Sequence, residues 1–145
     1  MKHKKKLIAI FVLSGLVIFL LFPRTIILSA ERELQITDLN GKPIKNATVR
    51  QIWYQYSLSV KGEADFLCDS AGKVSLPERN IKTKNFDLLK GCVSNFKNYF
   101  IHASCCTSDS IGIFSKGYED AWFYDGNGLE DGSVTMTPGK SQIFK

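Results

Sequence analysis

Histidine is scarce in this chain, which limits the acid–base and metal chemistry that it can support. The chain has two histidines, His3 and His102, and only His102 lies after residue 30. No His-Glu-x-x-His motif occurs, the spacing that places two imidazoles on one helix face for zinc. The sequence therefore excludes a zinc peptidase. It predicts a protein that is not an enzyme and has no cofactor.

Net charge is also lacking once the first thirty residues are set aside. The formal charge of the whole chain is +5, from 19 basic and 14 acidic residues. The excess comes from five residues near the start: Lys2, Lys4, Lys5, Lys6 and Arg24. A domain with balanced charge has no electrostatic footprint for nucleic acid, so we exclude a nucleic-acid partner.

Long apolar runs are confined to residues 7–22, which follow the lysine cluster and carry no charge. Lysines beside a short apolar helix keep that end in the cytoplasm, as in an export signal. The run is slightly shorter than the roughly twenty residues that span a bilayer core, but residues 25–28 could extend it. We therefore predict membrane contact through residues 7–28. A signal cleaved after residues 28–30 remains the alternative.

This interpretation divides the chain at residue 30. Residues 1–30 are predicted to form a cytoplasmic basic stub and a membrane anchor or signal segment, and residues 31–145 an exported domain. The predicted location is the inner membrane, crossed once, with the domain in the periplasm or outside the cell. The predicted partner is another envelope protein, and the oligomeric state stays open.

No long segment after residue 30 has helical periodicity. Residues 33–38 and 47–60 alternate with period two, with a change of phase at Arg50 and Gln51 that indicates a β-bulge. Residues 64–69, 73–77, 99–106, 111–118, 121–124 and 133–138 are shorter candidates. Residues 78–98 are interpreted as an inserted loop or short helix. The pattern predicts an all-β fold, a Greek-key-type β-sandwich of about seven strands behind one N-terminal transmembrane or signal helix.

Three turn motifs occur in order along this part of the chain. They are LQITDLNGKPIKNATV at 34–49, DSAGKVSLP at 69–77 and SKGY at 115–118. Gly41 and Gly72 can adopt the positive φ that tight turns need, and Ala47 leaves room for close packing. The order of motifs resembles that of carboxypeptidase regulatory-like domains, which are prealbumin-like (transthyretin-like) β-sandwich modules. The resemblance implies a folding, adhesion or display module rather than a catalyst.

Four cysteines follow residue 30: Cys68, Cys92, Cys105 and Cys106. In an exported domain an even set predicts disulfides, here two, with three possible connectivities. Neighbouring strand residues point to opposite faces. We therefore expect Cys105 and Cys106 to reach different partners, each either Cys68 or Cys92.

A second hypothesis is an exported small-ligand or metal-binding protein. His102 with the cysteines could hold a soft metal, since imidazole and thiolate suit copper. The loop from Asp125 to Asp131 has oxygen ligands at alternate positions, but it lacks the fifth and twelfth ligands of a calcium loop. We therefore predict no metal site and keep this function as the alternative.

Aromatic side chains occur side by side at two places in the chain. Trp53 and Tyr54 are adjacent, and Trp122 and Tyr124 flank Phe123. Alternation along a strand places one of two neighbouring aromatics on the outer face. These residues either pack in the core and on the sheet or form a patch for a partner, because grouped exposed aromatics mark interfaces.

Overall fold

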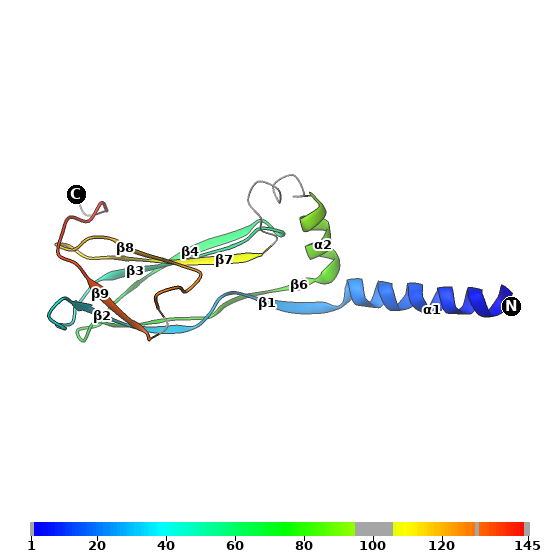
Figure 1. Cartoon of the computed structure of the whole chain (residues 1–145), viewed down its shortest axis with the longest axis horizontal. Coiled ribbons are helices and arrows are strands. Elements are labelled where there is room, and N and C mark those ends of the chain that lie inside the picture. The colour runs from blue at the N-terminus through cyan, green and yellow to red at the C-terminus, as the bar shows by residue number, and fades with distance from the viewer. Residues whose placement is uncertain (1, 95–105, 130, 144–145) are drawn as a thin grey trace.

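The computed structural model describes the chain except for residues 1, 95–105, 130 and 144–145. The described part is mostly β, with nine strands in three sheets and two helices. The molecule is elongated, with α1 at one end and the larger sheets at the other (Figure 1). The elements are α1 (Lys2–Leu21), β1 (Pro23–Ser29), β2 (Arg32–Asp38), β3 (Thr48–Gln55), β4 (Val60–Leu67), β5 (Lys73–Leu76), β6 (Arg79–Lys84), α2 (Asn85–Ser94), β7 (Thr107–Phe114), β8 (Ala121–Tyr124) and β9 (Ser133–Met136).

Two sheets share one hydrophobic core. The smaller sheet has the strand order β5-β2-β9, and the larger sheet has the order β4-β3-β7-β8. Alternate residues of their strands point inward, which is why the period-two pattern appears in the sequence. The fully buried members include Ile36 on β2, Leu76 on β5, Val49 on β3 and Ile113 on β7.

The third sheet is an antiparallel ribbon of β1 and β6. It continues the antiparallel pair of β2 and β5, because β1 leads into β2 and β5 leads into β6. Both pairs are interrupted at the same level, at residues 30–31 and 77–78. Pro77 lies at this interruption and has no N–H for a ladder. The ribbon runs from the two-sheet core toward α1 (Figure 1).

The predicted membrane segment is wrong. Among the residues that the structure describes, no helix is long and apolar enough to cross a membrane. The first turns of α1 carry Lys4, Lys5 and Lys6, and the apolar remainder, residues 7–21, spans only about 22 Å at 1.5 Å per residue, against about 30 Å of hydrocarbon. Residues 25–28, expected to extend it, belong to β1, and residues 25–27 pair with β6. The predicted single-pass inner-membrane location is therefore wrong as well.

The predicted fold class is corrected as well. The chain is mostly β, but β2 and β9 pair in parallel and the β1–β6 ribbon forms a third sheet. The stretch at 78–98, interpreted as a loop or short helix, contains both β6 and α2. The strand expected at 99–106 falls almost entirely outside the described residues.

The bulge expected at Arg50 and Gln51 does not form. The register of β3 with both β4 and β7 runs unbroken from Thr48 to Gln55. Val49, Gln51 and Gln55 are all buried on one face. The apparent change of phase arose because polar glutamines occupy inward positions.

Candidate functional site

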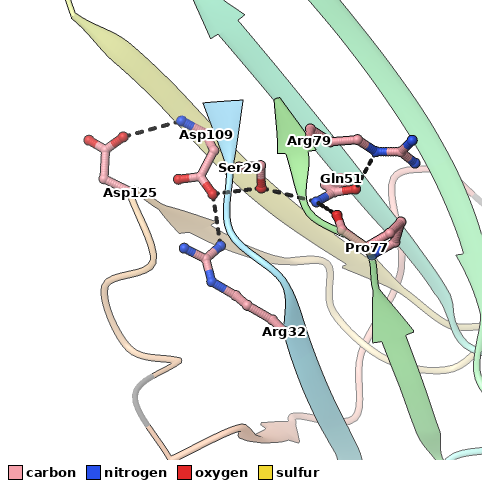
Figure 2. Close-up of polar contacts among 7 residues, drawn as sticks. All are labelled: Ser29, Arg32, Gln51, Pro77, Arg79, Asp109 and Asp125. Carbon is pink, nitrogen blue, oxygen red and sulfur yellow. Dashed lines mark hydrogen bonds and ion pairs between the residues drawn. The ribbon is translucent and has the colours of Figure 1, made fainter. Parts of the chain in front are cut away.

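The interior changes from apolar to polar where the ribbon leaves the core. Five side chains meet there, and we call them the polar junction: Ser29, Arg32, Gln51, Arg79 and Asp109 (Figure 2). Ser29 is 3% exposed and Gln51 is fully buried. They come from five different strands, β1, β2, β3, β6 and β7. Buried polar groups of this kind require hydrogen-bond partners.

The contacts of the polar junction form one continuous chain. Arg32 Nη1 donates to Asp109 Oδ2 at 2.8 Å, and Ser29 Oγ donates to the same oxygen at 2.9 Å. Gln51 Nε2 donates to Ser29 Oγ and to the carbonyl of Pro77, both at 3.0 Å. Arg79 Nε donates to Gln51 Oε1 at 3.2 Å. The network thus ties the ribbon to the larger sheet (Figure 2).

Two features anchor the ends of this network. The side chains of Arg32 and Asp109 are 20% and 10% exposed, so their ion pair is largely shielded from water. The guanidinium of Arg79 lies 4.8 Å from the ring centre of Trp53 and 5.9 Å from that of Phe66. Such cation–π contacts favour the positive charge over the ring face.

The turn after β8 holds β7 from the other side. The Asp125 amide donates to the Asp109 carbonyl at 2.8 Å, and Asp125 Oδ1 accepts from the Asp109 amide at 3.3 Å. Asp125 has a φ of 52°, and Gly126 packs so closely that a Cβ there would lie 2.6 Å from Arg32 Nη2. This turn therefore fixes one side of the polar junction.

The polar junction is suited to structural support rather than to chemistry. Nucleophilic catalysis needs a base that is free to take the proton of the hydroxyl. The carboxylate facing Ser29 already pairs with Arg32. The adjoining pocket, of about 290 Å³, includes Ser29, Arg32, Asp109 and Asp125 in its lining. That volume is just below the roughly 300–1,000 Å³ of typical ligand pockets.

Three of the predicted aromatic residues share the outer face of the larger sheet. We call Tyr54, Trp122 and Tyr124 the aromatic face. In the strand register Trp122 is opposite Gly112 and Tyr124 is opposite Ser110. Trp122 is 42% exposed and Tyr124 is 62% exposed. The small residues of β7 leave these rings standing above the sheet.

Neighbouring rings fix the position of this face. Trp122 contacts Phe114 edge to face, with ring centres 5.3 Å apart, and Tyr54 contacts Tyr56 at 4.3 Å. Trp53, the fourth predicted patch residue, points to the opposite face of the sheet, where Arg79 covers it. The predicted patch therefore grouped Trp53 with three residues that lie on the other face of the sheet.

A charged pair lies beside the aromatic face. Arg50 Nε and Nη2 donate to the two carboxylate oxygens of Asp65 at 2.7 and 2.8 Å. Arg50 is opposite Gly112 in the register, in the same row as Trp122. The bidentate hydrogen bonds lower the pKa of Asp65 and raise that of Arg50.

The predicted disulfides are not found among the cysteines that the structure describes. Cys68, Cys92 and Cys106 form none, and Cys105 falls outside the described residues. Cys92 Sγ lies 3.2 Å from Ser57 Oγ, and the Cys106 carbonyl accepts from the Tyr56 amide at 3.4 Å, so both cysteines lie before β4. Cys68, the predicted partner of one of the paired cysteines, follows the other end of β4. Eight strand residues separate these places by about 25 Å, far beyond the roughly 7 Å that a disulfide can bridge. Cys68 is instead a core residue, and its burial raises the pKa of its thiol to about 11.

Those residues of the alternative ligand hypothesis that the structure describes are not brought together. His102 lies outside the described residues. Asp125 is bound to Asp109, and Asp131 accepts from the amide and hydroxyl of Ser133 at 3.0 and 2.8 Å, which lowers its pKa. Within the described ranges no three His, Cys, Asp or Glu residues are grouped so as to hold a metal ion.

A larger hollow, of about 500 Å³, lies on the smaller sheet. Its lining includes the carboxylates of Glu33, Asp69 and Asp131 together with Lys73. Asp69 Oδ1 accepts from the amides of Ala71 and Lys73 within its own turn, both at 2.8 Å. Because the carboxylates of Asp69 and Asp131 are hydrogen-bonded within their own turns, this hollow is a polar surface rather than an assembled site.

No family model matches the sequence. No curated protein matches it either. Among solved structures, 3-chlorocatechol 1,2-dioxygenase from Rhodococcus opacus 1CP is similar with a TM-score of 0.44 and 11% identity, over 78% of this chain and 61% of that one. Wild-type catechol 1,2-dioxygenase from Acinetobacter radioresistens gives 0.44 and 12%, over 79% and 52%. The chain thus spans between half and about three fifths of the length of these enzymes. Likeness at this level carries no argument about activity.

Proposed function

We propose that this chain is a non-catalytic protein-binding module and that the aromatic face is its binding surface. One observation carries the proposal: Trp122 and Tyr124 are 42% and 62% exposed and stand on the same sheet face as Tyr54. Aromatic rings exposed together on one surface mark interaction sites.

The composition of this face favours a protein partner. Trp, Tyr and Arg are the residues that contribute most to binding energy at protein interfaces, and charged pairs tend to lie at the rim. Here Trp122 and Tyr124 are the exposed rings, and the Arg50–Asp65 pair lies beside them in the open. Phe114 holds the ring of Trp122 and Tyr56 holds that of Tyr54, so these two side chains would lose little entropy on binding.

The polar junction supports this function indirectly. It fixes β7 against the ribbon through Asp109, and β7 is the strand that lies between Tyr54 and Trp122. Its own groups pair with one another, and its pocket is about 290 Å³. The alternative, small-molecule binding, therefore has less support than a protein contact on the open sheet face.

Site-specific photo-crosslinking in cells of the native host tests the proposal. A photoreactive phenylalanine analogue replaces Tyr124, and the matched control carries it at Thr135, which is exposed on the smaller sheet. We expect a discrete protein adduct from position 124 that position 135 does not give. The partner is identified by mass spectrometry, and an adduct with a second copy of the chain also supports the proposal.

A variant then connects the adduct to the rings. Tyr54→Ser, with the crosslinker kept at position 124, should reduce the yield of the adduct several-fold, whereas Thr135→Ala should not. Equal labelling from positions 124 and 135, or no protein adduct from position 124, would overturn the proposal. Circular dichroism of each purified variant separates lost binding from lost folding.

A further inference from the structure

We propose that Asn127 is a site of spontaneous modification, at which the amide side chain is converted to aspartate and isoaspartate. The residue lies in the turn after β8 and is followed by Gly128. Both residues are exposed. The reaction needs no enzyme and only bulk water as co-reactant.

The chemistry is an attack of the backbone on the side chain. The nitrogen of Gly128 bonds to Cγ of Asn127, the bond from Cγ to Nδ2 breaks, and ammonia leaves with the amide proton, which gives a five-membered succinimide. Water then opens the ring at either carbonyl. One opening gives aspartate, and the other gives isoaspartate, whose main chain is longer by one carbon. Glycine in the following position favours the attack, because it has no side chain to obstruct the ring.

The local structure leaves the attacking nitrogen available. In this turn the amide of Asn127 donates to the carbonyl of Tyr124 at 3.0 Å, and that of Leu129 donates to the carbonyl of Gly126 at 3.2 Å. Within the described residues the amide of Gly128, between them, has no hydrogen-bond acceptor. Gly128 has a φ of 81°, which also lies outside regular structure.

A second Asn-Gly pair in the same chain provides an internal comparison. The amide of Gly41 donates to the carbonyl of Asp38 at 3.0 Å. The amides of Asn40 and Lys42 both donate to Asp38 Oδ1, at 2.8 and 2.9 Å. The turn around Asn40 is therefore held by three bonds to one residue, and the nitrogen that would attack is occupied. We infer that Asn127 reacts faster than Asn40 in the folded protein.

The reaction would alter the end of the aromatic face and the edge of the polar junction. The new carboxylate would lie two residues from Asp125, next to Gly126, which packs on Arg32. Isoaspartate would lengthen the main chain inside the turn that closes on Tyr124, the most exposed ring of the face. The modification therefore adds a negative charge and changes the backbone at one end of β8.

Ageing of the purified full chain tests this inference without any binding partner. After incubation in mildly alkaline buffer, peptide mapping by mass spectrometry measures the gain of one dalton at each Asn-Gly pair, and an isoaspartyl methyltransferase detects isoaspartate. We expect Asn127 to be converted several-fold faster than Asn40. In urea, where both turns are lost, the two rates should become equal.

Two outcomes would overturn the inference. One is equal conversion of Asn127 and Asn40 in the folded protein, and the other is faster conversion of Asn40. The variant Asn127→Gln, in which attack would require a larger ring, should lose the fast conversion while Asn40 stays unchanged. Because the readout is mass, failure of the proposed binding face would not affect the result.

Discussion

The inner face of the larger sheet is covered by two different surfaces. One half packs on the smaller sheet through apolar side chains such as Ile36, Leu76 and Ile113. The other half meets the ribbon through Ser29 and Gln51 of the polar junction. The same strand, β3, thus contributes apolar Val49 to one half and polar Gln51 to the other. One strand can therefore support a non-directional core and a directional hydrogen-bond network within a few residues.

Substitutions in the apolar half should give the largest loss of stability. Ile36 is fully buried at the centre of the smaller sheet. Ile36→Ala should lower the free energy of unfolding by about 3 kcal/mol, since it removes buried methyl groups and leaves a cavity. Urea titration followed by tryptophan fluorescence measures the loss. Thr135→Ala, on an exposed position of the same sheet, is the control and should change stability little.

Changes in the polar junction should lower stability less than changes in the apolar core. The loss should depend on charge pairing as well as on packing. Asp109→Ala would leave Arg32 and Ser29 without their acceptor and should cost about 2 kcal/mol, since the pair is partly shielded from water. The double variant Arg32→Leu with Asp109→Leu should cost less than Asp109→Ala, because no uncompensated charge remains. If the single changes Arg32→Leu and Asp109→Leu simply add in a double-mutant cycle with the double variant, the pair does not couple and the network has no energetic role.

The smallest effect should be on pH dependence at the surface. Hydrogen bonds from Ser133 lower the pKa of Asp131 below the ordinary aspartate value of 3.8. The contribution of Asp131 to stability is therefore present above that pH and is lost as the pH falls through the lower folded value. The melting temperature should therefore fall slightly more below about pH 4 for the parent than for Asp131→Asn. Identical pH profiles would contradict this. The pKa of Asp65 is lowered as well, and because Asp65 is present in both proteins, its contribution to the pH dependence of stability is the same in each.

The sequence was informative where side chains alternate and poor where polar residues turn inward. The alternation around Ile36 and Val74 reflects the inward positions of the smaller sheet. Gln51 was misinterpreted because a polar residue at an inward position interrupts the apolar alternation in the same way as a bulge. Gln51 is two residues from Val49, however, and therefore faces the same side of the strand. Arg32 and Asp109 are 77 residues apart, and no local pattern indicates that they meet. The strand β6 was missed because its six residues, RNIKTK, contain a single large apolar side chain.

The disulfide prediction shows a related limit. It rested on an even number of cysteines and on an assumed oxidising compartment. Neither says how far apart the cysteines lie in the folded chain. The core position of Cys68 and the contact of Cys92 with Ser57 follow from how β4 and α2 are placed. The aromatic pairs were separated for a simpler reason, because Trp53 and Tyr54 necessarily face opposite sides of one strand.

The continuity of β1 with β2 has a mechanical consequence. β2 is the central strand of its sheet, flanked by β5 and β9, and β1 extends the same chain direction along β6 toward α1 (Figure 1). Ladder hydrogen bonds run across the strands, so tension applied at the N-terminal end and directed along β1 would load them in shear. In shear the bonds of a ladder must yield together, whereas in peeling they yield one at a time. Pulling on the N-terminal arm along β1 would therefore be resisted by the paired neighbours of β1 and β2 acting together.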